Sequence, residues 1–277
     1  MMNVLINGQA PQTTDVFSVE DRGLMYGDGV FRTFIVQFGQ PRHWEKQYQI
    51  LQHDAERLLL AVPSSATLLS EIKQLTADNA FAVVKIVVTR GLGERGYARP
   101  KNPQPVHIVY AQACSAPAER LRLGINLYDC QTRWAIQPLF AGIKHLNRLE
   151  NVWARSEWEN APDVYQEGLV KNHHGAVISG TMSNLFIVQG HAILTPPLDE
   201  SGVAGAMRSL LLEATLPWPV RVQPLNQADI LAADAVFLSN SVFGIWPVAR
   251  YQTQTWQDFS VAQFLSDYLH SIAVQSA

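Results

Sequence analysis

The chain has 277 residues, 47% of them apolar and 16% charged, which suits one large or two modest domains with a large core and room for a subunit interface. The net charge of −3 and the lack of Lys or Arg runs argue against nucleic-acid partners, and Cys114 and Cys130 form no disulfide or zinc pattern. No stretch approaches the roughly 18 apolar residues of a membrane helix and no leader-like segment opens the chain, so we expect a cytoplasmic protein without a membrane partner.

The first third of the chain has the pattern of a sheet with one helix. Residues 3–9 and 30–40 each predict a strand that ends in a turn containing glycine. From Glu45 to Leu60 apolar residues recur at helical spacing, which predicts an amphipathic helix. Residues 81–90 and 105–113 are rich in β-branched residues and predict two strands. The Gly-rich, charged loop between them is too long for a tight hairpin, and such loops often carry function.

The periodic pattern is lost near residues 112–120, and we therefore expect a boundary between a domain of residues 1–115 and one of residues 116–277. In the second domain the patterns predict helices at 147–161, 205–214 and 260–274 and strands at 168–172, 176–180, 184–189 and 235–240. Helices and strands follow one another without a regular βαβ alternation. This irregular order favours the α+β class.

Lys144 lies between a loop of small residues and the predicted start of a helix, and no acidic residue follows it before Glu150. A lysine in such a place can be desolvated, which lowers the pKa of its amine and makes it a nucleophile toward an aldehyde cofactor. A lysine at such a position can equally be a solvated surface charge. The residues around Lys144 favour the first interpretation.

Residues 142–151, GIKHLNRLEN, closely resemble the lysine segment of the fold-type-IV pyridoxal-phosphate enzymes, and in particular that of the aminodeoxychorismate lyases. Further segments resemble the same family in the same order: DRGLMYGDGVFRTF at 21–34, TRGLGERGY at 89–97, GTMSNLF at 180–186, GVAGAMR at 202–208 and SNSVFGIWPV at 239–248. The resemblance implies a two-domain α+β fold like that of D-amino-acid aminotransferase, with a small N-terminal α/β sandwich and a larger β-rich, cofactor-binding domain. It also implies a homodimer in which Lys144 holds pyridoxal 5′-phosphate.

Two of these segments can form an anion site. A glycine-containing turn opens the predicted helix at 205–214, so N–H groups near Ala206 and Met207 can point at a phosphate. Asn240 and Ser241 end a predicted strand and can add further donors. On sequence alone the glycines can simply shape a loop, and Asn240 and Ser241 can simply cap a strand. The resemblance favours cofactor binding by all four.

The loop RGLGERGY brings Arg90, Arg95 and Tyr97 together. A guanidinium group can grip a carboxylate at two points, and aminodeoxychorismate is a dicarboxylate, so we expect this loop to bind the substrate. The alternative is a charged loop that is only solvated.

Most of the signature at 21–34 has the composition of turns and is expected to build structure. Thr33 is the exception, because the resemblance places the matching threonine near Lys144 and makes it a catalytic candidate. Arg32 and His145 flank the motifs and are secondary candidates.

The chain departs from the family pattern at two positions. Most fold-type-IV enzymes carry an acidic residue before the glycine of the GTMSNLF-like segment, where it pairs with the ring nitrogen of the cofactor, and this chain has Ser179. A hydroxyl group makes the ring a weaker electron sink than a carboxylate does. Counted from Thr33, the helical arginine that usually grips the phosphate falls at Ile50, and Arg57 lies about 10 Å further along the helix. Both departures predict weaker cofactor binding.

The reaction implied by the resemblance is elimination of pyruvate from 4-amino-4-deoxychorismate, which leaves 4-aminobenzoate for folate synthesis. Lys144 would remove the C4 proton as a base and then protonate the leaving group. Aromatisation helps to drive this elimination, so a weaker electron sink suffices, whereas Ser179 counts against transamination. The alternatives are a branched-chain or D-amino-acid aminotransferase of the same fold and a non-catalytic relative. His173 and His174 predict a turn, and no metal site is expected.

Overall fold

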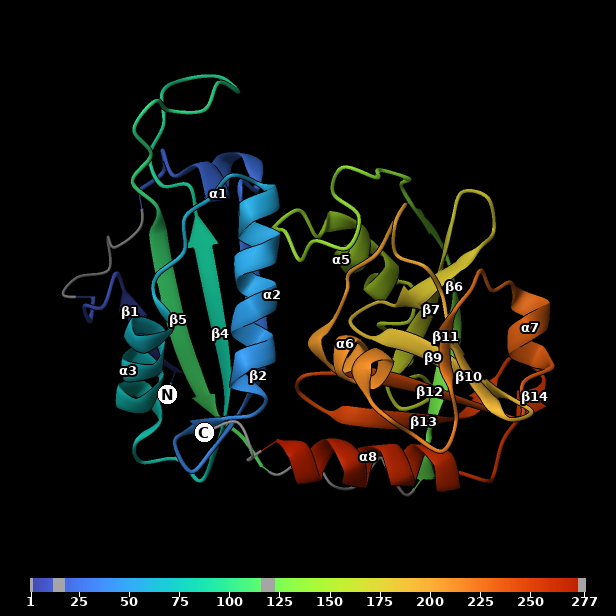
Figure 1. The fold of residues 1–277 in the computed structure, drawn as a ribbon. Coiled ribbons are helices and arrows are strands. Elements are labelled where there is room, and N and C mark those ends of the chain that lie inside the picture. The colour runs from blue at the N-terminus through green and yellow to red at the C-terminus, as the bar shows by residue number, and fades with distance from the viewer. Residues whose placement is uncertain (1, 12–17, 116–122, 274–277) are drawn as a thin grey trace. The chain divides into compact units, whose positions relative to one another are not determined.

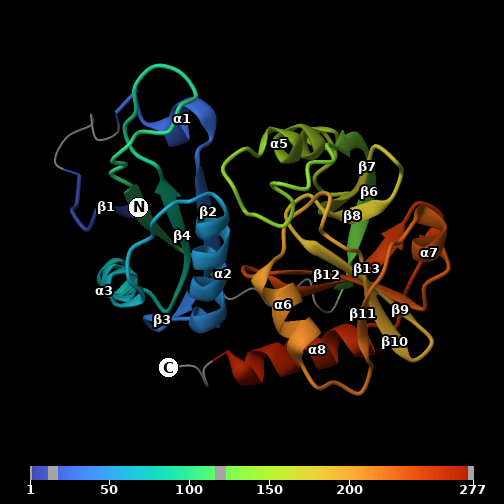
Figure 2. The ribbon, with the colours of Figure 1, turned by 45° about the horizontal axis from the view of Figure 1, so that its top comes forward.

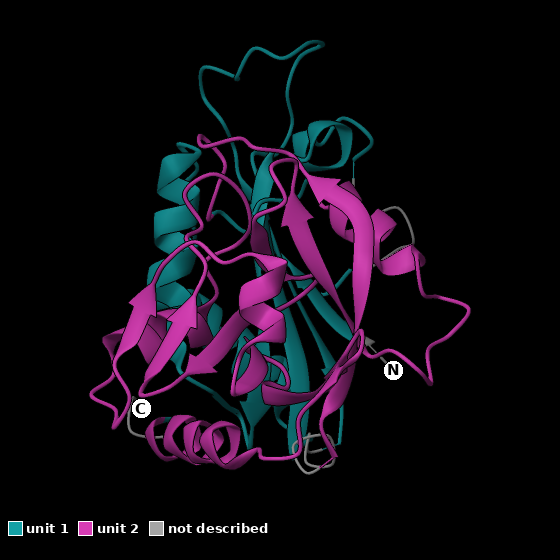
Figure 3. Cartoon of the chain, turned by 90° about the vertical axis from the view of Figure 1, so that its right-hand side faces the viewer, with its two compact units in different colours: residues 1–116, 143–147, 273–277 teal, residues 117–142, 148–272 magenta. Residues whose placement is uncertain are grey.

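The computed structural model describes residues 2–11, 18–115 and 123–273. The chain divides into two units, drawn in different colours in Figure 3. Unit 1 contains residues 1–116, 143–147 and 273–277, and unit 2 contains residues 117–142 and 148–272. None of the described helices is long and apolar enough to cross a membrane.

The predicted boundary between residues 115 and 116 lies at the edge of the described residues. The structure differs from the predicted second domain at two places, because residues 143–147 and the residues from 273 on belong to unit 1. Backbone pairing explains the first difference: the N–H groups of Phe31 and Leu146 donate to the carbonyls of Lys144 and Gly29, each at 3.0 Å. The lysine segment is thus attached to the sheet of unit 1.

Unit 1 contains a sheet in the order β1-β5-β4-β2-β3, in which every neighbouring pair is antiparallel. Its strands are β1 (Met2–Ile6), β2 (Gly29–Gln37), β3 (Gln40–Pro41), β4 (Phe81–Thr89) and β5 (Val106–Ala113). The predicted turn after β1 is present, with Asn7 and Gly8 both at positive φ, 48° and 78°. The strands predicted in this half of the chain are therefore confirmed.

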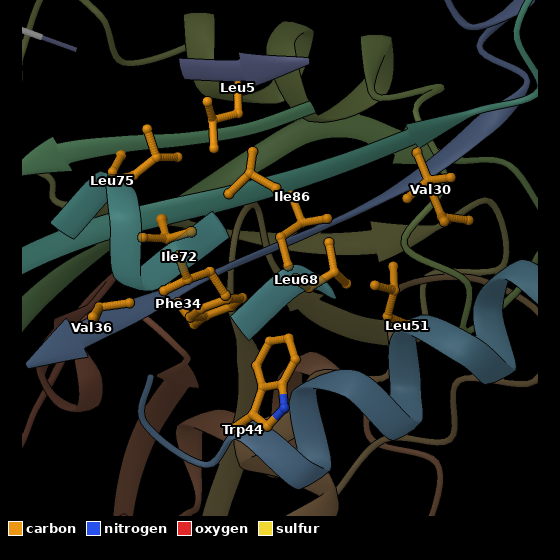
Figure 4. Close-up of a cluster of buried hydrophobic side chains, with 14 of the residues drawn as sticks. Leu5, Val30, Phe34, Val36, Trp44, Leu51, Leu68, Ile72, Leu75 and Ile86 are labelled. Carbon is orange, nitrogen blue, oxygen red and sulfur yellow. The ribbon is translucent and has the colours of Figure 1, made fainter. Parts of the chain in front are cut away.

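The helices of unit 1 are α1 (Arg22–Tyr26), α2 (Trp44–Arg57) and α3 (Ser65–Thr76). Helices α2 and α3 pack against one face of the sheet, where Phe34, Leu51 and Ile72 belong to a single buried cluster (Figure 4). The helix expected from residue 45 to 60 is α2, which Figure 1 shows lying along β2. The periodicity of its apolar residues follows from this packing.

Unit 2 is richer in strands, as expected. Its sheet runs β11-β10-β9-β12-β13-β6-β7-β8, and β14 pairs with β13. The strands are β6 (Ile125–Trp134), β7 (Glu167–Asn172), β8 (Val177–Gly180), β9 (Asn184–Gln189), β10 (Ala192–Thr195), β11 (Val220–Val222), β12 (Ala235–Asn240), β13 (Gly244–Tyr251) and β14 (Gln254–Thr255). The helices are α5 (Leu149–Ser156), α6 (Ala206–Glu213), α7 (Gln227–Leu231) and α8 (Ser260–Ile272). These two units confirm the predicted α+β class.

Candidate functional site

The backbone of Lys144 is held on both sides. Its C=O accepts a hydrogen bond from the Phe31 N–H at 3.0 Å, which ties it to β2. Its N–H donates to Asp54 Oδ2 at 3.0 Å, which ties it to α2. The position of the lysine Cα is therefore fixed by two different elements of unit 1.

The side chain of Lys144 lies over an aromatic ring. Its Nζ is 4.5 Å from the ring centroid of Phe31, and Lys85 Nζ is 4.6 Å from the same centroid. Lys85 pairs in register with Thr33, so Phe31, Thr33 and Lys85 lie on the sheet face opposite α2. The structure thus gathers Lys144, Phe31 and a second amine, on the face that also carries the predicted Thr33.

Sequence reasoning missed Lys85. Burial lowers the pKa of its amine, because the charged form loses hydration. The available signal was a single cation inside the apolar strand FAVVKIVVT, a place where a lysine is rarely accidental. Its neighbours could not be predicted, since they depend on the register between β2 and β4.

Arg90 is committed to contacts within the protein. Its Nε and Nη2 bind the two oxygens of Asp28 at 2.8 and 2.9 Å, and its remaining donors reach the carbonyls of Leu58 and Leu59. Burial alone would raise the pKa of Asp28, but the hydrogen bonds from Arg90 and Arg22 outweigh it and hold the pKa below its ordinary value. This geometry gives Arg90 a structural role and leaves the substrate-binding expectation to its neighbours in the loop.

Arg95 and Tyr97 are both exposed. The backbone of this part of the loop is held by Arg22, whose guanidinium donates to the carbonyls of Gly96, Tyr97 and Ala98 at 3.1 to 3.2 Å. The loop thus presents a cation and an aromatic ring from a fixed backbone.

In unit 2, Asn184 joins three of the segments expected to bind the cofactor. At the start of β9, its Oδ1 accepts from the Gly205 N–H at 3.0 Å and its Nδ2 donates to Val203 O at 2.8 Å. It also pairs in register with Ser239 of β12. Residues 180–186, 202–208 and 239–248, far apart in the sequence, therefore meet here, and Figure 2 shows α6 beside β12.

The start of α6 has the features of an anion site. Among the described residues its N-cap, Gly205, makes no side-chain capping hydrogen bond, so the N–H groups of Ala206 and Met207 in the first turn can donate to a ligand. A Cβ at Gly205 would lie 2.4 Å from Asn184 Oδ1, so a larger residue would displace that side chain. In the described residues, the buried Ser239 Oγ has no hydrogen-bond partner. Together these features fit a phosphate group.

The predicted ligands Asn240 and Ser241 lie at the end of β12. The Asn240 side chain donates to Met182 O at 3.1 Å and accepts from the N–H groups of Val242 and Phe243, each at 2.9 Å. Asn240 thus shapes the turn that presents Ser241.

Ser179 is buried in β8, and its hydroxyl donates to Gly180 O at 2.8 Å. The neighbouring carboxylate is Glu167 of β7, which is completely buried. Glu167 accepts from the Thr181 and Met182 N–H groups at 3.0 and 3.2 Å and from the hydroxyl groups of Thr181 and Ser183. This carboxylate holds the segment after β8 and was missed from sequence.

Ile50 lies on α2, one turn before Asp54, while Arg57 is exposed at the end of the helix. Arg32 of β2 reaches Asp54, with its Nη1 3.4 Å from Asp54 Oδ2. His145 pairs with Val30 in an isolated bridge. Arg32 is therefore a buried cation that pairs with a carboxylate of α2.

Comparison with known proteins gives consistent results. Residues 29–251 match the family model described as amino-transferase class IV. An aminodeoxychorismate lyase from Vibrio harveyi is 36% identical over 88% of this chain and 89% of its own length. The crystal structure of 4-amino-4-deoxychorismate lyase from Pseudomonas aeruginosa has a TM-score of 0.87 and 39% identity, covering 97% of this chain and 98% of that one. A putative branched-chain-amino-acid aminotransferase from Methanocaldococcus jannaschii is 28% identical over 89% of this chain and 87% of its own.

Proposed function

This chain belongs to the class IV aminotransferase family, and from that premise we propose that it is a pyridoxal-phosphate-dependent 4-amino-4-deoxychorismate lyase. The observation that carries the proposal is the likeness to two lyases over almost the whole chain, at 36% and 39% identity. In the cytoplasm, such an enzyme would supply 4-aminobenzoate for folate synthesis.

Separate residues would hold the two ends of the cofactor. Lys144 would hold it covalently, because its backbone is fixed from both sides and its amine lies over Phe31. The uncapped start of α6, with Ala206 and Met207, would take the phosphate, and Asn240 and Ser241 would complete that site. Ser179 would face the ring nitrogen with a hydroxyl group in place of a carboxylate.

Pyridoxal phosphate, when bound, supplies the electron sink for loss of the C4 proton. The substrate amine would first displace Lys144 from its bond to the cofactor. The freed Lys144 Nζ would then take the C4 proton from the substrate, and the C–O bond to the enolpyruvyl group breaks as the ring becomes aromatic. The same amine returns a proton to the enolpyruvate carbon, which gives pyruvate. One lysine acts first as base and then as acid. Thr33, on the same sheet face as Phe31, would orient the reacting groups.

The two substrate carboxylates need cations. Lys85 is suited to one of them, because its amine is 4.6 Å from the ring centroid over which Lys144 also lies. Arg95 on the exposed loop is suited to the other, with Tyr97 beside it.

Replacing Lys85 by methionine is therefore expected to raise KM for aminodeoxychorismate about tenfold to a hundredfold, with a smaller effect on kcat. Burial lowers the pKa of Lys85, so the wild-type enzyme should lose affinity as the pH rises through that lowered value. Steady-state kinetics across pH measure both effects. Lys73→Met on the exposed face of α3 is the matched control, and an unchanged KM in Lys85→Met would remove Lys85 from the substrate site.

An aminotransferase is the competing activity. Its support is a relative at 28% identity, which is more distant than the lyases. The hydroxyl group at Ser179 fits elimination better, because transamination requires negative charge to be held in the ring for longer.

Complementation tests the proposed function in cells. A bacterial strain that needs 4-aminobenzoate because it lacks its own lyase should grow without this supplement when it expresses the chain. Lys144→Ala should not restore growth at equal protein level. Failure of the wild-type chain, expressed and folded, would count against the lyase.

We also propose that the protein is a homodimer. Leu149, Val152 and Trp153 lie on one face of α5 and are 76%, 63% and 67% exposed. An apolar stripe of this kind on a helix is typical of a subunit interface.

Trp153→Glu is expected to raise the dimer dissociation constant about 30-fold or more, because buried tryptophans often dominate interfaces. Light scattering after size-exclusion chromatography measures this change. Val222→Glu, at a position 49% exposed on β11, is the control and should leave the dimer intact. A Trp153→Glu protein with the wild-type dissociation constant would place the interface elsewhere.

A further inference from the structure

The strongest unassigned feature is the carboxylate of Asp54 on α2, which is 1% exposed. Its Oδ2 accepts two hydrogen bonds, from the Lys144 N–H at 3.0 Å and from Arg32 Nη1 at 3.4 Å. Its other oxygen lies 3.7 Å from Nδ1 of the exposed His53. One buried carboxylate thus links a helix, a strand and the lysine segment.

Arg32 depends on this carboxylate. The arginine is 3% exposed, and in the part of the chain that the structure describes its Nε has no hydrogen-bond partner. Burial lowers the pKa of Arg32, and Asp54 opposes that shift. Removing Asp54 alone would leave a buried cation without its counter-charge, which is strongly unfavourable.

Asp54 also helps to fix the backbone of Lys144, and with it the position from which the lysine side chain extends. The Lys144 C=O is already fixed on the Phe31 N–H, so the hydrogen bond to Asp54 fixes the other side of the same residue. Burial raises the pKa of Asp54, whereas Arg32 and the Lys144 N–H favour its charged form. Small displacements of a reacting group have large effects on rate.

We propose that Asp54 is a positioning residue that holds Lys144 in place through the backbone N–H of the lysine, with Arg32 as the counter-charge of the carboxylate. The role rests on the proposed function of Lys144. Asp54 itself does not touch the substrate or the cofactor in this role.

Hydrogen exchange in the protein without cofactor tests the contact itself. Asp54→Ala should increase the exchange rate of the Lys144 amide about fivefold or more, because the amide N–H loses its hydrogen-bond acceptor. Glu71→Gln is the matched control, since Glu71 is another buried carboxylate of unit 1 and pairs with His107 at 2.9 Å. Unchanged exchange at Lys144 in Asp54→Ala would overturn the proposal, whatever the function of the protein.

Cofactor loading tests the consequence. On addition of pyridoxal phosphate, the visible band of the lysine-bound cofactor should form about tenfold more slowly in Asp54→Ala than in Glu71→Gln. Melting curves ensure that equal folded fractions are compared. Equal rates in the two variants would overturn the positioning role.

A double variant separates positioning from loss of fold. Arg32→Gln with Asp54→Asn keeps an oxygen for the Lys144 N–H and leaves no unpaired cation, so its loading rate should return to within about threefold of wild type. A double variant as slow as Asp54→Ala would contradict the proposal. A wild-type protein that forms no visible band, although its Lys144 amide is protected, would instead overturn the proposed function.

Discussion

Lys144→Ala is expected to lower lyase turnover by about 10⁴-fold or more, because one change removes both the covalent attachment of the cofactor and the base that takes the C4 proton. The visible band that borohydride removes from the wild-type protein should be absent from the variant. Folding should be nearly unchanged, since the hydrogen bonds of Lys144 to Asp54 and Phe31 come from its backbone. Product formation and absorbance spectra are the measurements.

Lys73→Ala on the exposed face of α3 is the control for general effects of removing a lysine. It should keep wild-type turnover and the visible band. A Lys144→Ala protein that still turned over at a tenth of the wild-type rate or faster would show that another residue moves the proton. Lys85 would then be the first residue to test, because it shares the Phe31 ring.

Arg90→Ala is expected to lower the free energy of unfolding by about 3 kcal/mol, because it leaves the Asp28 carboxylate without its two-point partner and removes the donors to the partly buried carbonyls of Leu58 and Leu59. Arg95→Ala, on the exposed part of the same loop, should change it by about 0.5 kcal/mol or less. Urea denaturation measures both values. Equal stability of the two variants would contradict the structural role of Arg90.

The ion pair between Asp28 and Arg90 also makes the stability of the protein depend on pH. The pKa of Asp28 is lowered in the folded protein from its ordinary value of 3.8, so its stabilising contribution is complete above that value. This contribution is lost as the pH falls through the lowered pKa. Arg90→Ala should therefore show a smaller loss of stability on acidification than the wild type, and an equal loss would count against the pairing.

Much of the fold could be predicted from local patterns. The helix at α2 follows from apolar spacing, and the turn at Asn7 and Gly8 from two residues that tolerate positive φ. Helix α3 was missed although its signals are present, since Ser64 caps it by accepting from the Thr67 N–H at 3.1 Å. The strand orders could not be predicted, because they depend on contacts between distant segments.

The motifs of the candidate site could be predicted from the sequence, but the residues that hold those motifs in place could not. Lys144 lies within a resembling string, whereas Asp54 contacts it from 90 positions away and shows no local pattern. Arg90 is a second example, because an arginine in a charged loop gives no sign in the sequence that Asp28 binds its guanidinium. Partners fixed by tertiary structure explain both cases.

Product analysis with the purified protein, loaded with pyridoxal phosphate and given 4-amino-4-deoxychorismate, tests the central claim most directly. The lyase function predicts 4-aminobenzoate and pyruvate in equal amounts, with no amino acceptor required. Parallel assays with branched-chain and D-amino acids should show at most slow transamination. Rapid transamination of those amino acids without any 4-aminobenzoate would contradict the lyase function.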